Sequence, residues 1–149
     1  MSVPVRPRAA VLVGMFGAFA GSLIACTNSS PSLHIVTVVP PTNTPVHLSN
    51  VQPIFDRSCS PGCHSGSSPA QGLNLESGKS WQSLVNVFST EVGSLKRVWP
   101  GRSDRSYLVD KVEGSSIILG VRMPAGQLPL PPAEIQLIED WINDGADNI

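Results

Sequence analysis

The chain has 149 residues, of which 14% are charged, and its formal net charge at neutral pH is −1. A chain of this length supports one domain with a modest core. The sequence has no run of basic residues and no basic patch interleaved with aromatic residues, which argues against a nucleic acid as partner. The three cysteines are the most informative residues of the sequence.

The N-terminal residues 1–25 have the pattern of an export signal. Arg6 and Arg8 precede an uncharged, mostly apolar run that ends in Leu-Ile-Ala followed by Cys26. This ending resembles a bacterial lipoprotein lipobox, and the resemblance implies that Cys26 is acylated and becomes the first mature residue. The alternative is a short transmembrane anchor, because about 17 apolar or small residues lie at the lower limit for crossing a bilayer.

Both alternatives place most of the chain outside the cytoplasm and tether it to a membrane. We therefore expect a lipid-anchored protein of the cell envelope, in the periplasm or at the cell surface. More than one acyl chain on Cys26 suffices for stable anchoring. Thr27 stands where an Asp often retains lipoproteins at the inner membrane, which favours the outer membrane.

A spacer is expected between the lipid anchor and the folded domain. Residues 26–47 begin with Cys26 and are otherwise rich in Ser, Thr, Asn and Pro, without any Asp, Glu, Lys or Arg. This composition favours an extended linker. The folded domain is predicted to span residues 48–149.

The first helix of that domain is predicted to begin after Ser49 or Asn50, because either side chain can cap it. Pro53 then falls in the first turn, where the N–H that proline lacks has no helical partner. The helix leads directly into the two remaining cysteines.

Cys59, Cys63 and His64 lie within the segment CSPGCH. A histidine directly after the second of two nearby cysteines is typical of c-type haem attachment, in which the thiols add to two vinyl groups and the imidazole ligates the iron. The usual spacing has two residues between the cysteines, whereas this chain has three. Pro61 and Gly62 suit a bulge that accommodates the third, because proline fixes φ and glycine adopts conformations that other residues avoid.

Two other interpretations of these cysteines stay open. The compartment outside the cytoplasm is oxidising, so Cys59 and Cys63 can form a disulfide. The two thiols and His64 can also bind zinc with one further ligand, although the sequence has no second cysteine pair to complete a zinc ribbon.

The remaining helices are predicted from apolar spacing and from proline and glycine. The middle of the domain is expected to be rich in loops, with short helices over Leu84–Phe88 and Tyr107–Val112. Pro131–Pro132 opens a C-terminal helix, and Gly145 ends it. Apolar residues recur along this helix at Ile135, Ile138, Trp141 and Ile142. Trp141 is expected to pack against the first helix.

The order of these features resembles a class I c-type cytochrome, and the finer pattern resembles a group of small secreted cytochrome c-like domains from environmental bacteria. The matching segments are 51–59 (VQPIFDRSC), 72–75 (GLNL), 84–86 (LVN), 100–109 (PGRSDRSYLV), 122–124 (RMP) and 141–146 (WINDGA). The resemblance implies an all-α, loop-rich fold in which N- and C-terminal helices pack around one haem.

Met123 is the candidate sixth ligand of the iron. It follows His64 at a separation close to that in class I cytochromes, and the other methionines lie in the export signal. A thioether stabilises reduced iron and raises the reduction potential relative to two histidines. A packing role for Met123, and ligation by His34 or His47, are the alternatives. Candidate partners for a haem propionate are Trp99, Arg97, Arg102 and Arg122.

No motif points to catalysis. The sequence has no Gly-x-Ser-x-Gly, no His-Glu-x-x-His and no phosphate-binding glycine loop. We therefore expect an electron carrier and not an enzyme, with haem iron cycling between ferric and ferrous states and exchanging electrons with redox partner proteins. The alternatives are a haem-free, disulfide-clipped binding or structural module on the same fold, and an accessory redox subunit of a larger membrane or surface enzyme complex.

Overall fold

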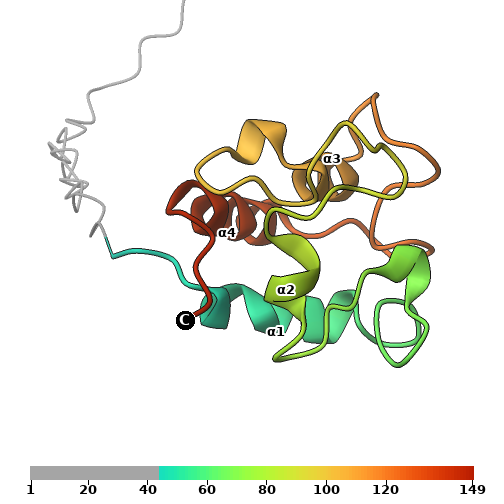
Figure 1. The fold of residues 1–149 in the computed structure, drawn as a ribbon, viewed down its shortest axis with the longest axis horizontal. Helices are drawn as coiled ribbons and strands as arrows, with labels where there is room; N and C mark the ends of the chain where they lie inside the picture. The colour runs from blue at the N-terminus through green and yellow to red at the C-terminus, as the bar shows by residue number, and fades with distance from the viewer. Residues whose placement is uncertain (1–43) are drawn as a thin grey trace, which may run out of the picture. The chain divides into compact units, whose positions relative to one another are not determined.

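The computed structural model describes residues 44–149, whose regular elements are helices joined by long loops (Figure 1). They are α1 (Leu48–Ser58), η1 (Ala70–Gly72), α2 (Ser80–Leu84), η2 (Ser103–Arg105), α3 (Tyr107–Glu113) and α4 (Pro132–Asn143), where η denotes a 3₁₀ turn. Extended segments of this region pair only through isolated bridges. The prediction of an all-α, loop-rich domain is confirmed for these residues. The export signal, Cys26, His34 and most of the spacer lie outside them.

Helix α1 begins at Leu48, so the predicted start after Ser49 or Asn50 is slightly late. His47 is the N-cap residue, and its backbone N–H donates to Asn50 Oδ1 at 2.9 Å. Asn50 thus caps the helix from inside its first turn, in the manner of a capping box. Because the helix starts earlier, Pro53 lies within it instead of in its first turn.

Helix α4 follows the prediction. Pro131 is its N-cap residue, Pro132 is its first residue, and Glu134 lies in its first turn, where a negative charge is favourable. Gly145 follows the helix with a φ of +110°, a conformation that glycine adopts without steric cost. The fully buried residues of α4 are Ile138, Trp141 and Ile142.

Helices α1 and α4 pack against each other at the centre of the core. Phe55 of α1 and Trp141 of α4 are both fully buried and meet edge to face, with ring centroids 6.4 Å apart and an interplanar angle of 76°. The predicted contact of Trp141 with the first helix is confirmed. The C-terminus lies beside the start of α1 (Figure 1), where Ser49 donates its backbone N–H to Ile149 O at 2.8 Å.

The middle of the domain differs in part from the prediction. Helix α3 confirms the helix expected over Tyr107–Val112, but α2 ends where the helix expected over Leu84–Phe88 should begin. Val85 instead pairs with Val98 in an isolated bridge, and Asn86 has a φ of +61°, which no helix accommodates. The β-branched valines favour this extended pairing over a helix.

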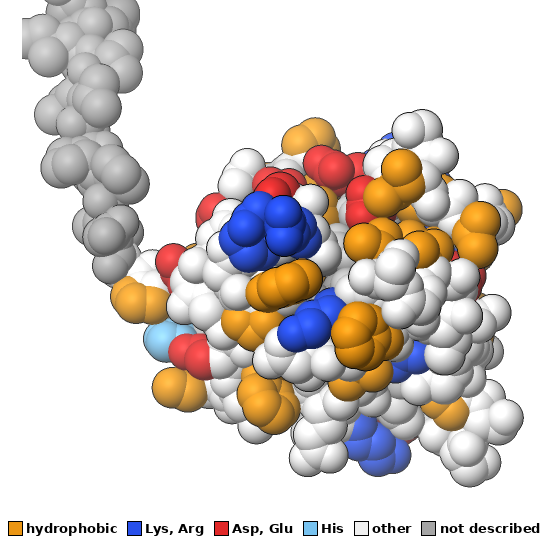
Figure 2. Space-filling view, turned by 45° about the horizontal axis from the view of Figure 1, so that its top comes forward, with side chains coloured by type: hydrophobic (Ala, Val, Ile, Leu, Met, Phe, Trp, Pro, Cys, Tyr) orange, Lys and Arg blue, Asp and Glu red, His pale blue; other side chains and the backbone are white. Residues whose placement is uncertain are grey.

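The surface of the domain is mixed in character. On the face shown in Figure 2, Lys and Arg side chains lie in separate groups, with hydrophobic and acidic side chains between or beside them. Ion pairs join Arg57 to Glu134 at 2.8 Å and Lys79 to Glu76 at 2.7 Å. Among the described residues, no helix is both long enough and apolar enough to span a membrane.

Candidate functional site

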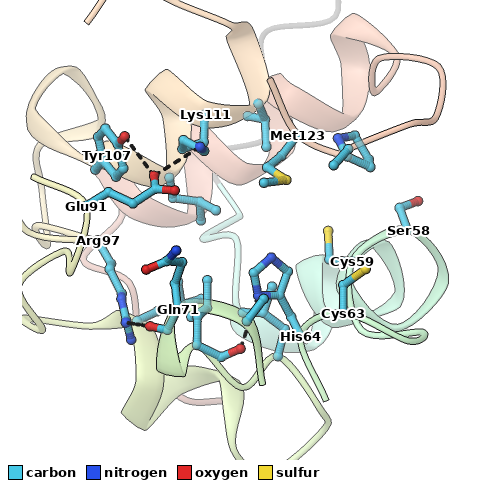
Figure 3. A pocket seen from close by; sticks show the side chains of 18 of the residues that line it. Ser58, Cys59, Cys63, His64, Gln71, Glu91, Arg97, Tyr107, Lys111 and Met123 are labelled. Atoms are coloured by element: carbon cyan, nitrogen blue, oxygen red, sulfur yellow. Dashed lines mark hydrogen bonds and ion pairs between the residues drawn. The ribbon is translucent and has the colours of Figure 1, made fainter. Parts of the chain in front are cut away.

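One cavity of about 200 Å³ brings together the residues that the sequence indicated: Cys59, Cys63, His64 and Met123. In Figure 3 the imidazole of His64 and the thioether of Met123 face each other across the cavity, and the two cysteine sulfurs lie at one end of it. The other lining residues are Ser58, Pro61, Ala70, Gln71, Leu73, Leu75, Leu84, Ser89, Thr90, Glu91, Arg97, Tyr107, Leu108, Lys111, Val112, Pro124, Ala125 and Gln127. The cavity therefore combines two thiols, an imidazole and a thioether in an otherwise largely apolar wall.

The loop between the two cysteines turns tightly at the end of α1. Cys59 is the C-cap residue of α1, and the N–H of Cys63 donates to Ser60 O at 3.3 Å. Gly62 has a φ of +75° within this turn, where a side chain would be strained. Pro61 and Gly62 thus lie in a tight turn between the two cysteines.

His64 is buried and offers one ring nitrogen to the cavity. Its Nδ1 lies 3.2 Å from Leu73 O, and because a carbonyl oxygen only accepts, Nδ1 carries the proton and Nε2 keeps a free lone pair. Burial lowers the pKa of His64, against the effect of hydrogen bonds to the Leu73 and Ala70 carbonyls. The charges of Arg97 and Lys111 lower this pKa further. The imidazole is therefore neutral at neutral pH, the form that binds a metal ion.

Met123 reaches the cavity from the segment that connects α3 to α4. Its backbone N–H donates to Lys111 O at 2.8 Å, which ties this segment to α3. The side chain is half-buried and packs against the core. Met123 therefore contributes to packing and also presents its sulfur to the cavity opposite His64 (Figure 3).

The two thiols differ in their surroundings. Cys59 is half-buried, and burial raises the pKa of its thiol to about 11, with Arg57 lowering and Glu134 raising it to smaller extents. Cys63 is exposed at the rim of the cavity. Both are free thiols in the structure. Cys59 is thus protonated at neutral pH.

Arg97 places a buried positive charge at the end of the cavity away from the cysteines (Figure 3). The residue is 8% exposed, and its guanidinium donates to Ser83 O at 2.9 Å and to Gln71 O at 2.6 Å. None of the ion pairs formed by residues 44–149 includes Arg97. Burial lowers its pKa. A buried cation without a counter-charge is costly, so this end of the cavity suits an anionic group.

Sequence reasoning missed Glu91, Tyr107 and Lys111, which line the same end of the cavity. Lys111 Nζ lies 3.0 Å from Glu91 Oε2, and the Tyr107 hydroxyl donates to the same oxygen at 2.9 Å. Glu91 is far from the other two in sequence, so no local motif indicates this contact. The available signal was the spacing of Tyr107 and Lys111 by one helical turn.

The other candidates lie away from the cavity. His47 Nδ1 lies 2.6 Å from Asp147 Oδ2, and His47 does not line the cavity. Arg102 pairs with Asp104 at 2.7 Å on the surface, so Arg97 is the one candidate propionate partner that lines the cavity. Within residues 44–149, no group of three or more His, Cys, Asp or Glu side chains is placed to hold a metal ion.

Comparisons of the chain with protein-family models, with curated proteins and with solved structures found no match. The cavity and the sequence motif are therefore the basis of the functional proposal.

Proposed function

We propose that this protein is a membrane-tethered, extracytoplasmic electron-transfer protein of the class I cytochrome c type, with one covalently bound haem c. The observation that carries the proposal is the cavity that joins Cys59, Cys63, His64 and Met123. Met123 is distant in sequence from the other three, and a hydrophobic core does not require these four groups to share one cavity. In a covalently attached haem with His/Met ligation, two thiols attach the porphyrin, and an imidazole and a thioether ligate the iron.

Each of these residues has a distinct role in the proposed site. The Cys59 and Cys63 thiols would add across the two vinyl groups of the haem and make the attachment covalent. His64 Nε2 and Met123 Sδ would be the two iron ligands. The hydrogen bond from His64 Nδ1 to Leu73 O fixes the tautomer and the orientation of the ring. Met123, as a soft thioether ligand, favours reduced iron and therefore a higher reduction potential.

The buried charge of Arg97 supports a ligand that carries an anionic group, as haem does. Haem carries two propionates, and the Arg97 guanidinium lies at the end of the cavity away from the thiols. No ion pair among the described residues includes Arg97. A propionate provides a counter-charge and offsets the cost of burying the cation.

When bound, haem supplies one-electron chemistry by alternating between ferric and ferrous iron. The chain's own part is to hold the ligands and to exclude water with an apolar wall. That wall includes Leu73, Leu75, Leu84, Leu108 and Val112. Cys63 stands at the exposed rim, and we place electron exchange with redox partner proteins there.

The packing of α1 against α4 supports a class I cytochrome c-like fold, in which the N- and C-terminal helices enclose one haem. We also propose that residues 1–25 are removed as a signal peptide and that Cys26 carries the lipid. Residues 26–47 then act as the spacer that holds the domain, residues 48–149, in the periplasm or at the cell surface, with the outer membrane favoured.

The test is a pyridine haemochrome spectrum of the chain exported by a host that attaches haem c, measured on native and on denatured protein. We expect one c-type haem per chain that stays with the denatured protein. Met123→Ala should then abolish the ferric Met–iron band without detaching the haem. Colourless protein without free thiols would show that a Cys59–Cys63 disulfide has formed instead, which is the haem-free alternative.

A matched set of variants in the loop separates a specific attachment from loosely bound haem. Cys59→Ala and Cys63→Ala should each keep haem through the one remaining thioether, with the pyridine haemochrome band shifted by the unreacted vinyl group, whereas the double variant should lose its haem on denaturation. Ser60→Ala is the control, because the Ser60 hydroxyl is buried and has no hydrogen-bond partner in the described region. Loss of covalent haem in the Ser60 variant would contradict the roles assigned to the thiols.

A further inference from the structure

Tyr107, Glu91 and Lys111 form a buried network at the end of the cavity opposite the cysteines (Figure 3). The Tyr107 hydroxyl donates to Glu91 Oε2 at 2.9 Å, and Lys111 Nζ lies 3.0 Å from the same oxygen. Tyr107 is 4% exposed, and the side chains of Lys111 and Glu91 are 9% and 19% exposed. The network thus joins α3 to the loop that carries Glu91, with both charges largely shielded from water.

The same network binds the backbone of the segment that leads to Met123. The N–H of Leu119 donates to the Tyr107 hydroxyl at 3.0 Å, and Lys111 Nζ donates to Leu119 O at 2.8 Å. Both backbone groups of Leu119 are therefore held by side chains of α3. The Leu119 side chain is 54% exposed, so its burial does not hold the segment.

Lys111 also holds Met123 directly through its backbone. The N–H of Met123 donates to Lys111 O at 2.8 Å. Lys111 therefore fixes the segment at two points, through its ammonium group at Leu119 and through its carbonyl oxygen at Met123. The segment has no helix or strand, so these bonds restrain the backbone at Met123, together with the bond from Arg122 Nε to Val112 O at 2.7 Å and the packing of the Met123 side chain against the core.

We propose that Tyr107, Glu91 and Lys111 act as one positioning network that keeps the Met123 thioether at the cavity for iron ligation. The network does not bind the iron; it acts through the backbone of Leu119 and Met123. The proposal rests on the proposed function, in which Met123 is an iron ligand.

A second lysine–glutamate pair in the domain provides a matched control. Lys79 Nζ lies 2.7 Å from Glu76 Oε2, but those side chains are 60% and 36% exposed and line no part of the cavity. Exposed ion pairs of this kind contribute little to the stability of the fold. Removing Lys111 leaves the largely shielded carboxylate of Glu91, 19% exposed, without its counter-charge, whereas removing Lys79 leaves Glu76 solvated.

The first experiment compares Lys111→Met, Tyr107→Phe and Lys79→Met in the haem-loaded full chain. Lys111→Met and Tyr107→Phe each remove two contacts of the network, and either change should lower the ratio of Met-bound to Met-free ferric haem by roughly tenfold, the order of effect of one to two hydrogen bonds. The ferric Met–iron band should weaken in the first two variants and stay intact in Lys79→Met, with covalent haem unchanged in all three. An unchanged band in both network variants, or an equal loss in Lys79→Met, overturns the proposal.

The second experiment does not depend on haem and uses amide hydrogen exchange of the full chain. In Tyr107→Phe, which keeps the ion pair and the core volume, the Leu119 amide should exchange roughly tenfold faster, and the Met123 amide should also accelerate. The amide of Gly101, which donates to Ile142 O at 2.7 Å, is the internal control. Faster exchange without any bound haem would show that the network holds the segment but would refute the proposed function and, with it, the role of the network in iron ligation. Bound haem with unchanged exchange and an unchanged band refutes the network alone.

Discussion

At the scale of single residues, two thiols of one short loop have different chemical environments. Cys59 lies in the wall of the cavity, where burial raises the pKa of its thiol to about 11, and Cys63 is exposed at the rim. Only a thiolate attacks an electrophile readily. The loop therefore presents one accessible thiol and one that the folded domain shields.

This difference predicts an order of alkylation in reduced, haem-free protein. At about pH 8, Cys63 should be modified first, and the rate at Cys59 should rise about tenfold per pH unit up to its pKa of about 11. Mass spectrometry of the modified peptides measures both rates, and the same reaction in denaturant is the control, where the two thiols should react alike. Equal rates in the folded protein would contradict the assigned burial.

The same pKa shift has a defined effect on stability. The folded state holds the Cys59 proton more tightly than the unfolded state, whose thiol has the ordinary pKa of 9.0. The free energy of unfolding should therefore fall as the pH rises from about 9 toward about 11.

At the scale of elements, the contact between α1 and α4 is the main determinant of the fold. Phe55→Ala should lower the free energy of unfolding by about 3–5 kcal/mol, because it removes a fully buried ring and its edge-to-face partner contact with Trp141. Phe88→Ala is the matched control, since Phe88 is 58% exposed and its loss should change stability by about 0.5 kcal/mol or less. Denaturant unfolding measures both values, and similar losses would show that the helix pair does not dominate the core.

The end of α3 provides a test of local backbone geometry. Gly114 and Gly101 both have a φ of +75°, so an alanine at either position carries a left-handed penalty of about 1–2 kcal/mol. A Cβ at Gly114 would also lie 2.8 Å from Arg122 Cδ, whereas nothing lies within 4 Å at Gly101. Gly114→Ala should therefore be more destabilising than Gly101→Ala by about 1 kcal/mol. The excess should shrink in an Arg122→Ala background, which removes the contacts to Arg122 Cδ and Cγ but leaves Cβ at 3.3 Å; an undiminished excess there would contradict this explanation.

Some elements could be predicted from the sequence because their signals are local. Pro131–Pro132 and the apolar spacing define α4 without reference to the rest of the chain. The N-cap residue of α1 is His47, close to the predicted Ser49 or Asn50. The helix expected over Leu84–Phe88 failed because a distant segment decides the conformation there. Asn86 donates its N–H to Val98 O at 2.9 Å, and Val98 donates to Leu84 O at 3.1 Å. Such pairing overrides local preference.

At the scale of the whole molecule, the candidate site combines local and distant information. Cys59, Cys63 and His64 form a motif that the sequence displays directly, and the resemblance to cytochromes indicated Met123. That these four share one cavity depends on the fold. The carbonyl that orients His64 and the polar network at the far end depend on contacts between loops, which no spacing rule reveals. The sequence thus indicated the donor atoms but not the groups that position them.

The cavity as a whole favours a largely apolar ligand that carries an anionic group at one end. The role of Arg97 in binding that group can be tested. In the haem-free chain its buried charge lacks a carboxylate partner among the described residues, and a haem propionate would supply one. Arg97→Met should therefore destabilise the haem-loaded protein more than the haem-free protein, by about 1.5–3 kcal/mol for a charged hydrogen bond. Bonds from Arg97 to backbone carbonyls are lost in both forms and cancel in the difference.

Denaturant unfolding of both forms, with wild type and variant, gives the four free energies of this cycle. Arg102→Met is the control, because Arg102 pairs with Asp104 on the surface and does not line the cavity. Its effect on the free energy of unfolding should therefore be the same in the haem-loaded and haem-free forms. An equal effect of Arg97→Met in the two forms would mean that the guanidinium serves only the loop carbonyls. The positive end of the cavity would then give no support to haem as its ligand, and the proposal would depend on the thiols, His64 and Met123 alone.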